Sequence, residues 1–164
     1  MMRRKESGLT AFELAVTLAI IAVMASVTMP PYLKWWRKAQ LRGAVSNLAA
    51  DLELARTQAI RENATVVVEF QTRDYKLFFD TGDGEGGAPN WSQESDEGLI
   101  LKRHLPPGVK IDTDSLSFPT QSAKTRFNSR GIPFDIVAPE TIPITQKGQD
   151  RQITINRLGN IDVQ

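Results

Sequence analysis

The sequence predicts an α+β protein in which one long N-terminal helix packs on antiparallel β-sheet. Apolar residues recur at helical spacing over the first third of the chain. Short segments rich in β-branched and aromatic residues fill most of the remainder, separated by Gly, Pro and Asp turns. Strands joined by short turns form antiparallel sheet rather than βαβ units, and one helix followed by many strands is the α+β pattern.

The composition excludes several function classes. The 164 residues suffice for one domain with an appendage, and the net charge of +1 lacks the basic excess of a typical nucleic-acid binder. Cysteine is absent, which excludes disulfides, thiolate metal sites and cysteine nucleophiles. His104 is the single histidine and has no plausible partner, so we expect it to be structural. We expect a protein that is not an enzyme and has no cofactor.

The N-terminal segment predicts a membrane helix. Arg3, Arg4 and Lys5 precede the stretch 9–29, in which Glu13 is the only charged residue. Twenty-one helical residues rise about 31 Å, which matches a hydrocarbon core of about 30 Å. A cleaved secretory signal peptide is the alternative, but no small-x-small site follows the stretch.

The helical pattern continues beyond the apolar stretch, through residues 32–63. Pro30 and Pro31 stand at the junction, where we expect a kink because proline removes a backbone donor. The inner stripe of the continued helix comprises Leu41, Val45, Leu48, Leu52, Ala55 and Ala59. The opposite, polar face comprises Lys38, Asp51, Glu53, Arg56 and Arg61.

The remaining residues predict strands. The segments 64–70 and 74–79 form a hairpin around the break 71–73. Further strands are expected at 99–105, 109–112, 115–118, 125–128, 134–137, 141–146 and within 151–164. Gly131 and Gly159 are expected to be turn glycines with positive φ.

The loop 80–98 is acidic and rich in glycine. Asp80, Asp83 and Glu85 are candidate calcium ligands, but their spacing misses the EF-hand pattern, and solvated turn residues are the alternative. The tetrapeptide at 79–82, Phe-Asp-Thr-Gly, occurs once, whereas an aspartic protease needs two facing aspartates. We expect no catalytic residues.

The N-terminal signal resembles that of type IV prepilins and type II secretion pseudopilins. Gly8 is followed by an apolar residue, then by Thr10, and Glu13 is the fifth residue after the glycine. The resemblance implies that a membrane peptidase cuts after Gly8 and that Leu9, the new N-terminus, is then methylated. It also assigns Glu13 to the family's acidic position and Pro30 to its helix-kinking proline.

The body of the chain is similar to the GspH/FimT group of minor pseudopilins and minor pilins. The segments that carry this resemblance are 53–70, the acidic loop, 99–111, 126–133 and 153–161. It implies a pilin-like fold with a leader at 1–8, a transmembrane and assembly helix at 9–31, an amphipathic helix at 32–63 and a β-rich periplasmic domain at 64–164.

The resemblance also implies a function and partners. We expect a minor pseudopilin of a type II secretion system that helps initiate or cap a periplasmic fibre for protein export. A minor pilin of a type IV pilus is the alternative. The partners would be the prepilin peptidase and methyltransferase, other pseudopilins or pilins, and the inner-membrane assembly platform. The N-terminus would lie in the cytoplasm.

Glu13 is the one charge in the apolar stretch and has two interpretations. After cleavage, its carboxylate can neutralise an α-amine, that of a neighbouring subunit in a packed bundle, and so penalise wrong axial registers. In the other interpretation, Glu13 only snorkels to the cytoplasmic headgroups.

The cations that follow the apolar stretch also have two interpretations. Lys34, Arg37 and Lys38 lie among Tyr32, Trp35 and Trp36, a composition typical of an interfacial belt. A DNA contact is the alternative, with Arg157 as a further candidate. Only one arginine and an aspartate occupy the C-terminal stretch where some FimT-like pilins carry a DNA-binding run, so we do not expect nucleic acid as a partner.

Overall fold

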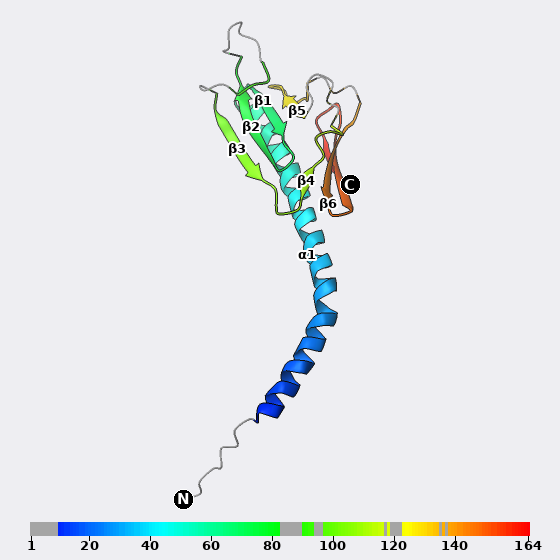
Figure 1. Cartoon of the computed structure of the whole chain (residues 1–164). Coiled ribbons are helices and arrows are strands. Elements are labelled where there is room, and N and C mark those ends of the chain that lie inside the picture. The colour runs from blue at the N-terminus through cyan, green and yellow to red at the C-terminus, as the bar shows by residue number, and fades with distance from the viewer. Residues whose placement is uncertain are drawn as a thin grey trace, which may run out of the picture. The chain divides into compact units, whose positions relative to one another are not determined.

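The computed structural model describes residues 10–82, 90–93, 97–116, 118, 123–134, 136 and 138–164. The chain divides into two compact units, Met1–Arg37 and Lys38–Gln164, and we call the second unit the head. Helix α1 (Ala11–Arg61) runs through both units, and every strand belongs to the head (Figure 1). Pro30 and Pro31 both lie inside α1.

The C-terminal end of α1 has a defined cap. Asn63 adopts a left-handed φ of 49°, which asparagine tolerates better than most residues. The Ala64 amide then donates to the Ala59 carbonyl at 3.1 Å, and the Asn63 amide donates to Ile60 at 3.4 Å. These bonds form a Schellman motif, which satisfies two carbonyls of the last turn and ends the helix two residues before the predicted boundary.

The first sheet has the strand order β3-β2-β1-β5, and all its pairs are antiparallel. Its strands are β1 (Thr65–Phe70), β2 (Asp74–Asp80), β3 (Leu99–His104) and β5 (Lys124–Phe127). The β1–β2 hairpin closes where the Gln71 amide donates to the Asp74 carbonyl at 2.8 Å, so the break predicted at 71–73 is confirmed.

The second sheet has the order β4-β6-β7-β8 and is also antiparallel. Its strands are β4 (Lys110–Ile111), β6 (Glu140–Gln146), β7 (Gln149–Ile155) and β8 (Ile161–Val163). The predicted C-terminal segment 151–164 therefore contributes two paired strands with a turn between them. The expected fold class, one long helix with antiparallel sheet, is confirmed.

The core of the head lies between α1 and the inward faces of both sheets. All six residues of the predicted inner stripe are buried, and Leu48 and Leu52 have no exposed surface. They share one apolar cluster with Val66 and Val68 of β1 and with strand residues of the second sheet. Burying one such aliphatic side chain contributes about 1.5–3 kcal/mol, so this face of the helix accounts for much of the head's stability.

Three predictions about local structure were wrong. Asp51 belongs to the buried face of α1 rather than to its polar face, because it is only 6% exposed. Ser115 and Leu116 form no strand, and neither do Phe134 and Ile136. Leu116 and Ile136 are nevertheless buried, because irregular segments carry them into the core. A short apolar run indicates burial, but it does not by itself indicate extended pairing.

Candidate functional site

The described part of the apolar stretch is exposed on every side of α1. Phe12 is 79% exposed and Val27 is 70% exposed, and large apolar side chains between them are also open. A window of this helix reaches a mean hydropathy of 2.1 with none of it buried, so by length and composition the helix can cross a membrane. A helix that is apolar all round needs lipid or other helices as its surroundings.

The hydroxyl groups of this stretch are satisfied within the helix. Thr17 donates to the Leu14 carbonyl at 2.8 Å, and Ser26 donates to Val23 at 2.7 Å. Thr28 donates to the carbonyl of Met24 at 3.0 Å. In hydrocarbon an unpaired hydroxyl is costly, whereas these back-bonded hydroxyls need no water. The stretch is therefore suited to lipid despite its polar residues.

Glu13 lies in the first turn of α1, where Thr10 acts as the N-cap. The Thr10 Oγ1 accepts the Glu13 amide at 3.3 Å, and the Thr10 carbonyl accepts the Leu14 amide at 3.1 Å. A carboxylate in the first turn interacts favourably with the helix dipole. Among the described residues, no cation forms an ion pair with Glu13. Gly8 and Leu9, the predicted processing residues, lie outside the described residues.

The aromatic and basic candidates after the apolar stretch are mostly exposed. Tyr32 and Trp35 approach each other with ring centroids 6.2 Å apart, and Trp36 is 48% exposed. Lys34 is exposed and Arg37 is half-buried. An exposed set of tyrosine, tryptophan and cations fits the headgroup region of a bilayer.

Two of the DNA-contact candidates lie at opposite ends of the head. Lys38 begins the head's part of α1, whereas Arg157 lies on the turn between β7 and β8. That turn packs near Arg56, because a Cβ on Gly159 would lie 3.4 Å from the Arg56 Nε. Arg56 lies eighteen positions after Lys38 in α1, which is about 27 Å along the helix. The structure therefore does not bring Lys38 and Arg157 together.

Asp80 closes the base of the acidic loop. It is 1% exposed, its Oδ1 accepts the Asn90 amide at 3.2 Å, and its Oδ2 accepts the Trp91 amide at 3.1 Å. Glu97, which the sequence did not single out, accepts the Thr81 amide at 2.9 Å. Both carboxylates thus accept hydrogen bonds from main-chain amides. The described residues contain no cluster of three metal-ligating side chains. Asp83 and Glu85 lie outside the described residues.

Asp51, Tyr75 and Arg103 form a polar cluster between α1 and the first sheet. Asp51 Oδ2 accepts the Tyr75 hydroxyl at 2.6 Å and the Arg103 Nε at 2.6 Å, and Oδ1 accepts Arg103 Nη2 at 3.2 Å. Burial raises the pKa of Tyr75, and its hydrogen bond to Asp51 raises that pKa further. The hydrogen bond that Arg103 donates to Asp51 raises the pKa of Arg103. The cluster ties the helix to the β2 and β3 strands.

Two turns with the same geometry pack against each other beside α1. In each, the side chain of an asparagine, Asn128 or Asn156, accepts the amides two and four residues later. Gly131 and Gly159 have φ values of 72° and 80°, which confirms their prediction as turn glycines. A Cβ on Gly159 would lie 2.6 Å from the Gly131 carbonyl, which also accepts Arg56 Nε at 3.1 Å. Only glycine allows this approach.

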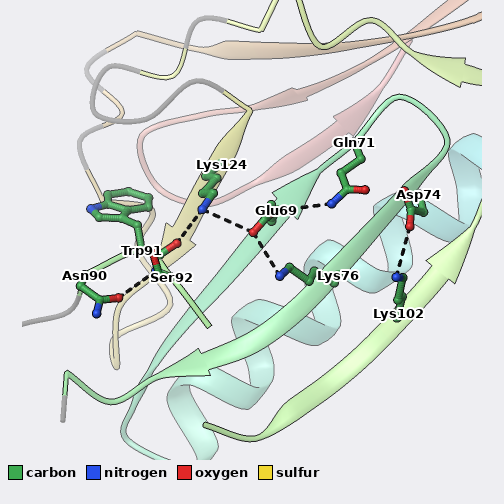
Figure 2. Close-up of polar contacts among 9 residues, drawn as sticks. All are labelled: Glu69, Gln71, Asp74, Lys76, Asn90, Trp91, Ser92, Lys102 and Lys124. Carbon is green, nitrogen blue, oxygen red and sulfur yellow. Dashed lines mark hydrogen bonds and ion pairs between the residues drawn. The ribbon is translucent and has the colours of Figure 1, made fainter. Parts of the chain in front are cut away.

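A second polar cluster covers the outer face of the first sheet (Figure 2). The Glu69 carboxylate pairs with Lys76 at 3.3 Å and with Lys124 at 3.4 Å, and Lys124 also donates to the Trp91 carbonyl at 2.8 Å. Burial pushes the pKa of Glu69 upward, but Lys124 and Lys76 outweigh it and hold that pKa below its usual value. The cluster links the central strand β1 to its two neighbours and to the loop at Trp91.

The fold is shared with solved pilin-like structures. The type IV minor pilin FimU of Pseudomonas aeruginosa matches with a TM-score of 0.58 and 14% identity, over 77% of this chain and 90% of FimU. The minor pseudopilin EpsH from the type 2 secretion system of Vibrio cholerae matches with a TM-score of 0.54 and 18% identity, over 76% of this chain and 96% of EpsH. No curated protein matches by sequence.

These matches define the fold as pilin-like. The model of the family described as Type II transport protein GspH matches residues 44–159. The chain belongs to this family, the minor pseudopilin and minor pilin group, whose members are structural subunits rather than enzymes. The predicted GspH/FimT resemblance is thereby confirmed.

Proposed function

We propose that the protein is a minor pseudopilin of a type II secretion system, a structural subunit that helps initiate or cap a short periplasmic fibre for protein export. The GspH family match over residues 44–159 carries this proposal. The exposed apolar part of α1 supports it, because subunits of such a fibre need a helix that is stable both in lipid and among neighbouring helices.

The proposal places the chain in the bacterial inner membrane with a single pass. Residues 9–31 form the transmembrane and assembly helix, 32–63 the amphipathic helix and 64–164 the periplasmic domain, with the N-terminus in the cytoplasm. The aromatic and basic residues after Pro31 fit the outer headgroup region. Pro30 and Pro31 would allow the helix to bend where it leaves the bilayer.

The leader 1–8 would be removed by the prepilin peptidase, which cuts between Gly8 and Leu9, and Leu9 would then be N-methylated. The mature helix would present an α-amine close to its acidic residue. The other partners would be the assembly platform and neighbouring pseudopilins, because the family consists of subunits that associate with other pilins or pseudopilins.

Glu13 would set the register of the subunit in the fibre. Its carboxylate has no ion pair among the described residues, and its surroundings on α1 are apolar. A buried charge without a partner is strongly penalised, so a neighbouring α-amine at the right height would stabilise one register over others. If Glu13 only snorkels to headgroups, it has no such effect.

Glu13→Gln separates these two roles, because it keeps the shape of the side chain and removes its charge. The variant should insert and be cleaved normally but lose crosslinks to the other pseudopilins at equal membrane abundance. Glu53→Gln, a change to an exposed glutamate of the head, is the matched control and should leave crosslinking unchanged. Equal crosslinking of Glu13→Gln and the wild type would refute the register role.

The alternative is a minor pilin of a type IV pilus, with or without DNA binding. FimU shares the fold, and a basic residue, Arg157, lies exposed on the β7–β8 turn. Deletion of the gene in its native host distinguishes the two functions. We expect secreted proteins to accumulate in the periplasm while twitching motility and DNA uptake persist. Loss of pili or of DNA uptake with normal secretion would replace the proposal by the alternative.

A further inference from the structure

A basic surface lies at the end of the head where the chain enters from the apolar unit. In the head, the turn between β6 and β7 lies at the same end as the first turns of the head's part of α1 (Figure 1). Gln146 Nε2 at the end of β6 donates to Gln40 Oε1 of α1 at 3.3 Å. A cleft of about 300 Å³ between these elements is lined by Lys38, Leu41, Arg42, Gln149, Asp150 and Arg151.

The cations of this surface come from two distant parts of the sequence. We define the basal surface as Lys38 and Arg42 of α1 together with Lys147 and Arg151 of the β6–β7 hairpin. Lys38, Arg42 and Lys147 are exposed and Arg151 is half-buried. Lys147 and Gly148 have φ values of 43° and 79°, those of a tight hairpin turn, so the position of the lysine at the tip is well defined.

None of these four cations forms an ion pair within the part of the chain that the structure describes. The ion pairs found there involve other cations, on α1 beyond Arg42 and on the first sheet. Asp150 is the one carboxylate that lines the cleft, so the basal surface has a clear positive excess. It is thus suited to bind an anionic surface, and arginine in particular binds phosphate in a bidentate manner.

The chain connection indicates which anionic surface is within reach. In α1, Lys38 lies nine positions after Met29, the end of the apolar stretch, which is about 13 Å of helix. The stretch between them carries Tyr32, Trp35 and Trp36, residues typical of the headgroup region. Phosphate groups of a bilayer that holds the apolar stretch would therefore lie close to the basal surface.

We propose that the basal surface docks the head on anionic phospholipid headgroups, with the β6–β7 hairpin as a second, sequence-distant membrane contact. The proposal rests on the membrane anchoring stated above. Docking fixes how the head is oriented on the bilayer before the subunit enters a fibre. A subunit that leaves the bilayer for the fibre must release these contacts, so anionic lipid content sets how readily it is extracted.

The test uses the full-length protein in lipid vesicles. The chain has no cysteine, so a single exposed Gln149→Cys on the hairpin can carry a fluorescent label without background. The vesicles contain phosphatidylcholine alone or with phosphatidylglycerol, each with a nitroxide quencher at headgroup depth. We expect strong quenching only with phosphatidylglycerol. It should fall in 1 M salt, where the Debye length is about 3 Å.

Charge reversal supplies the matched comparison. Each cation removed from an anionic membrane surface should reduce the ratio of docked to undocked head roughly fivefold. Arg42→Glu/Lys147→Glu should therefore bring quenching down to the phosphatidylcholine level. Arg130→Glu/Arg157→Glu makes the same charge change on exposed turn residues near the C-terminal end of α1 and should leave quenching unchanged. If the reversal variant misfolds by circular dichroism, Arg42→Gln/Lys147→Gln replaces it.

Flotation separates this inference from the proposed function. Protein that floats with both kinds of vesicle, but whose label stays unquenched, would overturn headgroup docking and leave the membrane anchor intact. Protein that fails to float with either vesicle would overturn both. Binding of labelled DNA that the same charge reversal abolishes, without quenching by lipid, would assign the basal surface to nucleic acid and also overturn the proposal.

Discussion

The cluster of Asp51, Tyr75 and Arg103 predicts that two substitutions at one ion pair have unequal costs. The Asp51 side chain is 8% exposed, whereas that of Arg103 is 41% exposed. Arg103→Met leaves a buried carboxylate with Tyr75 as its remaining donor, and breaking a buried pair in this way costs about 3 kcal/mol. Asp51→Asn leaves a guanidinium that can turn to water, so the cost is only that of the lost charged hydrogen bonds, about 1.5 kcal/mol.

The double variant sharpens this prediction. Asp51→Asn/Arg103→Met removes both charges, so it should be about as stable as Asp51→Asn alone and more stable than Arg103→Met. The neutral asparagine no longer requires a cation, and the Tyr75 hydroxyl keeps an acceptor. Such rescue by a second substitution is expected only if the two side chains interact directly, as the 2.6 Å contact indicates.

Urea unfolding of a fragment that begins at Lys38 measures these differences. Trp35 and Trp36 are absent from this fragment, so Trp91 is its single tryptophan. Trp91 stacks on the Arg126 guanidinium, 4.1 Å from the ring centroid, and its fluorescence should report the loss of that contact. Equal costs for the two single variants, or a double variant less stable than either, would refute the burial asymmetry.

Three further predictions concern processing, the core and the outer sheet face. Gly8→Arg should block removal of residues 1–8 by the cognate peptidase, because a bulky charged side chain does not fit a site for glycine. Detection of an uncut wild-type chain by mass spectrometry would contradict this prediction. Leu48→Asp should destabilise the head by about 4 kcal/mol or more in urea, since it places a charge in the core, and an unchanged midpoint would show that this face is not buried. The pKa of Glu69 is lowered, so its contribution to stability is present above the unfolded-state pKa and is lost as pH falls through the folded-state pKa. Glu69→Gln should therefore make the head less stable at neutral pH and less sensitive to acid, as unfolding curves at pH 7 and pH 3 can test.

The buried stripe of α1 was predictable from the sequence because a single physical rule determines it. A stripe at helical spacing must be buried, and Leu41, Leu48 and Ala59 all are. The same rule could have found Asp51, which lies three residues after Leu48 and four before Ala55, on the stripe itself. Its charge alone favours the polar face instead. A polar residue at a stripe position is better interpreted as a buried group that requires a partner.

The partner itself could not be predicted from periodicity. Arg103 lies fifty-two residues after Asp51, and the two meet only because β3 pairs with β2 at the edge of the first sheet. The same holds for the two asparagine turns, which resemble each other in sequence but whose contact through Gly131 and Gly159 depends on how the two sheets are placed. Pairings of this kind follow from tertiary structure alone.

The division of the chain explains why its charges fall into separate groups. In the apolar part of α1, Glu13 is the only charge, so any partner it has must come from outside that stretch. In the head, the described ion pairs join α1, β1, β2, β3 and β5 to one another and serve its stability. The four cations of the basal surface take part in none of these pairs. If the subunit moves from bilayer to fibre as proposed, Glu13 of the apolar unit and the basal surface of the head are the charged groups that would exchange partners.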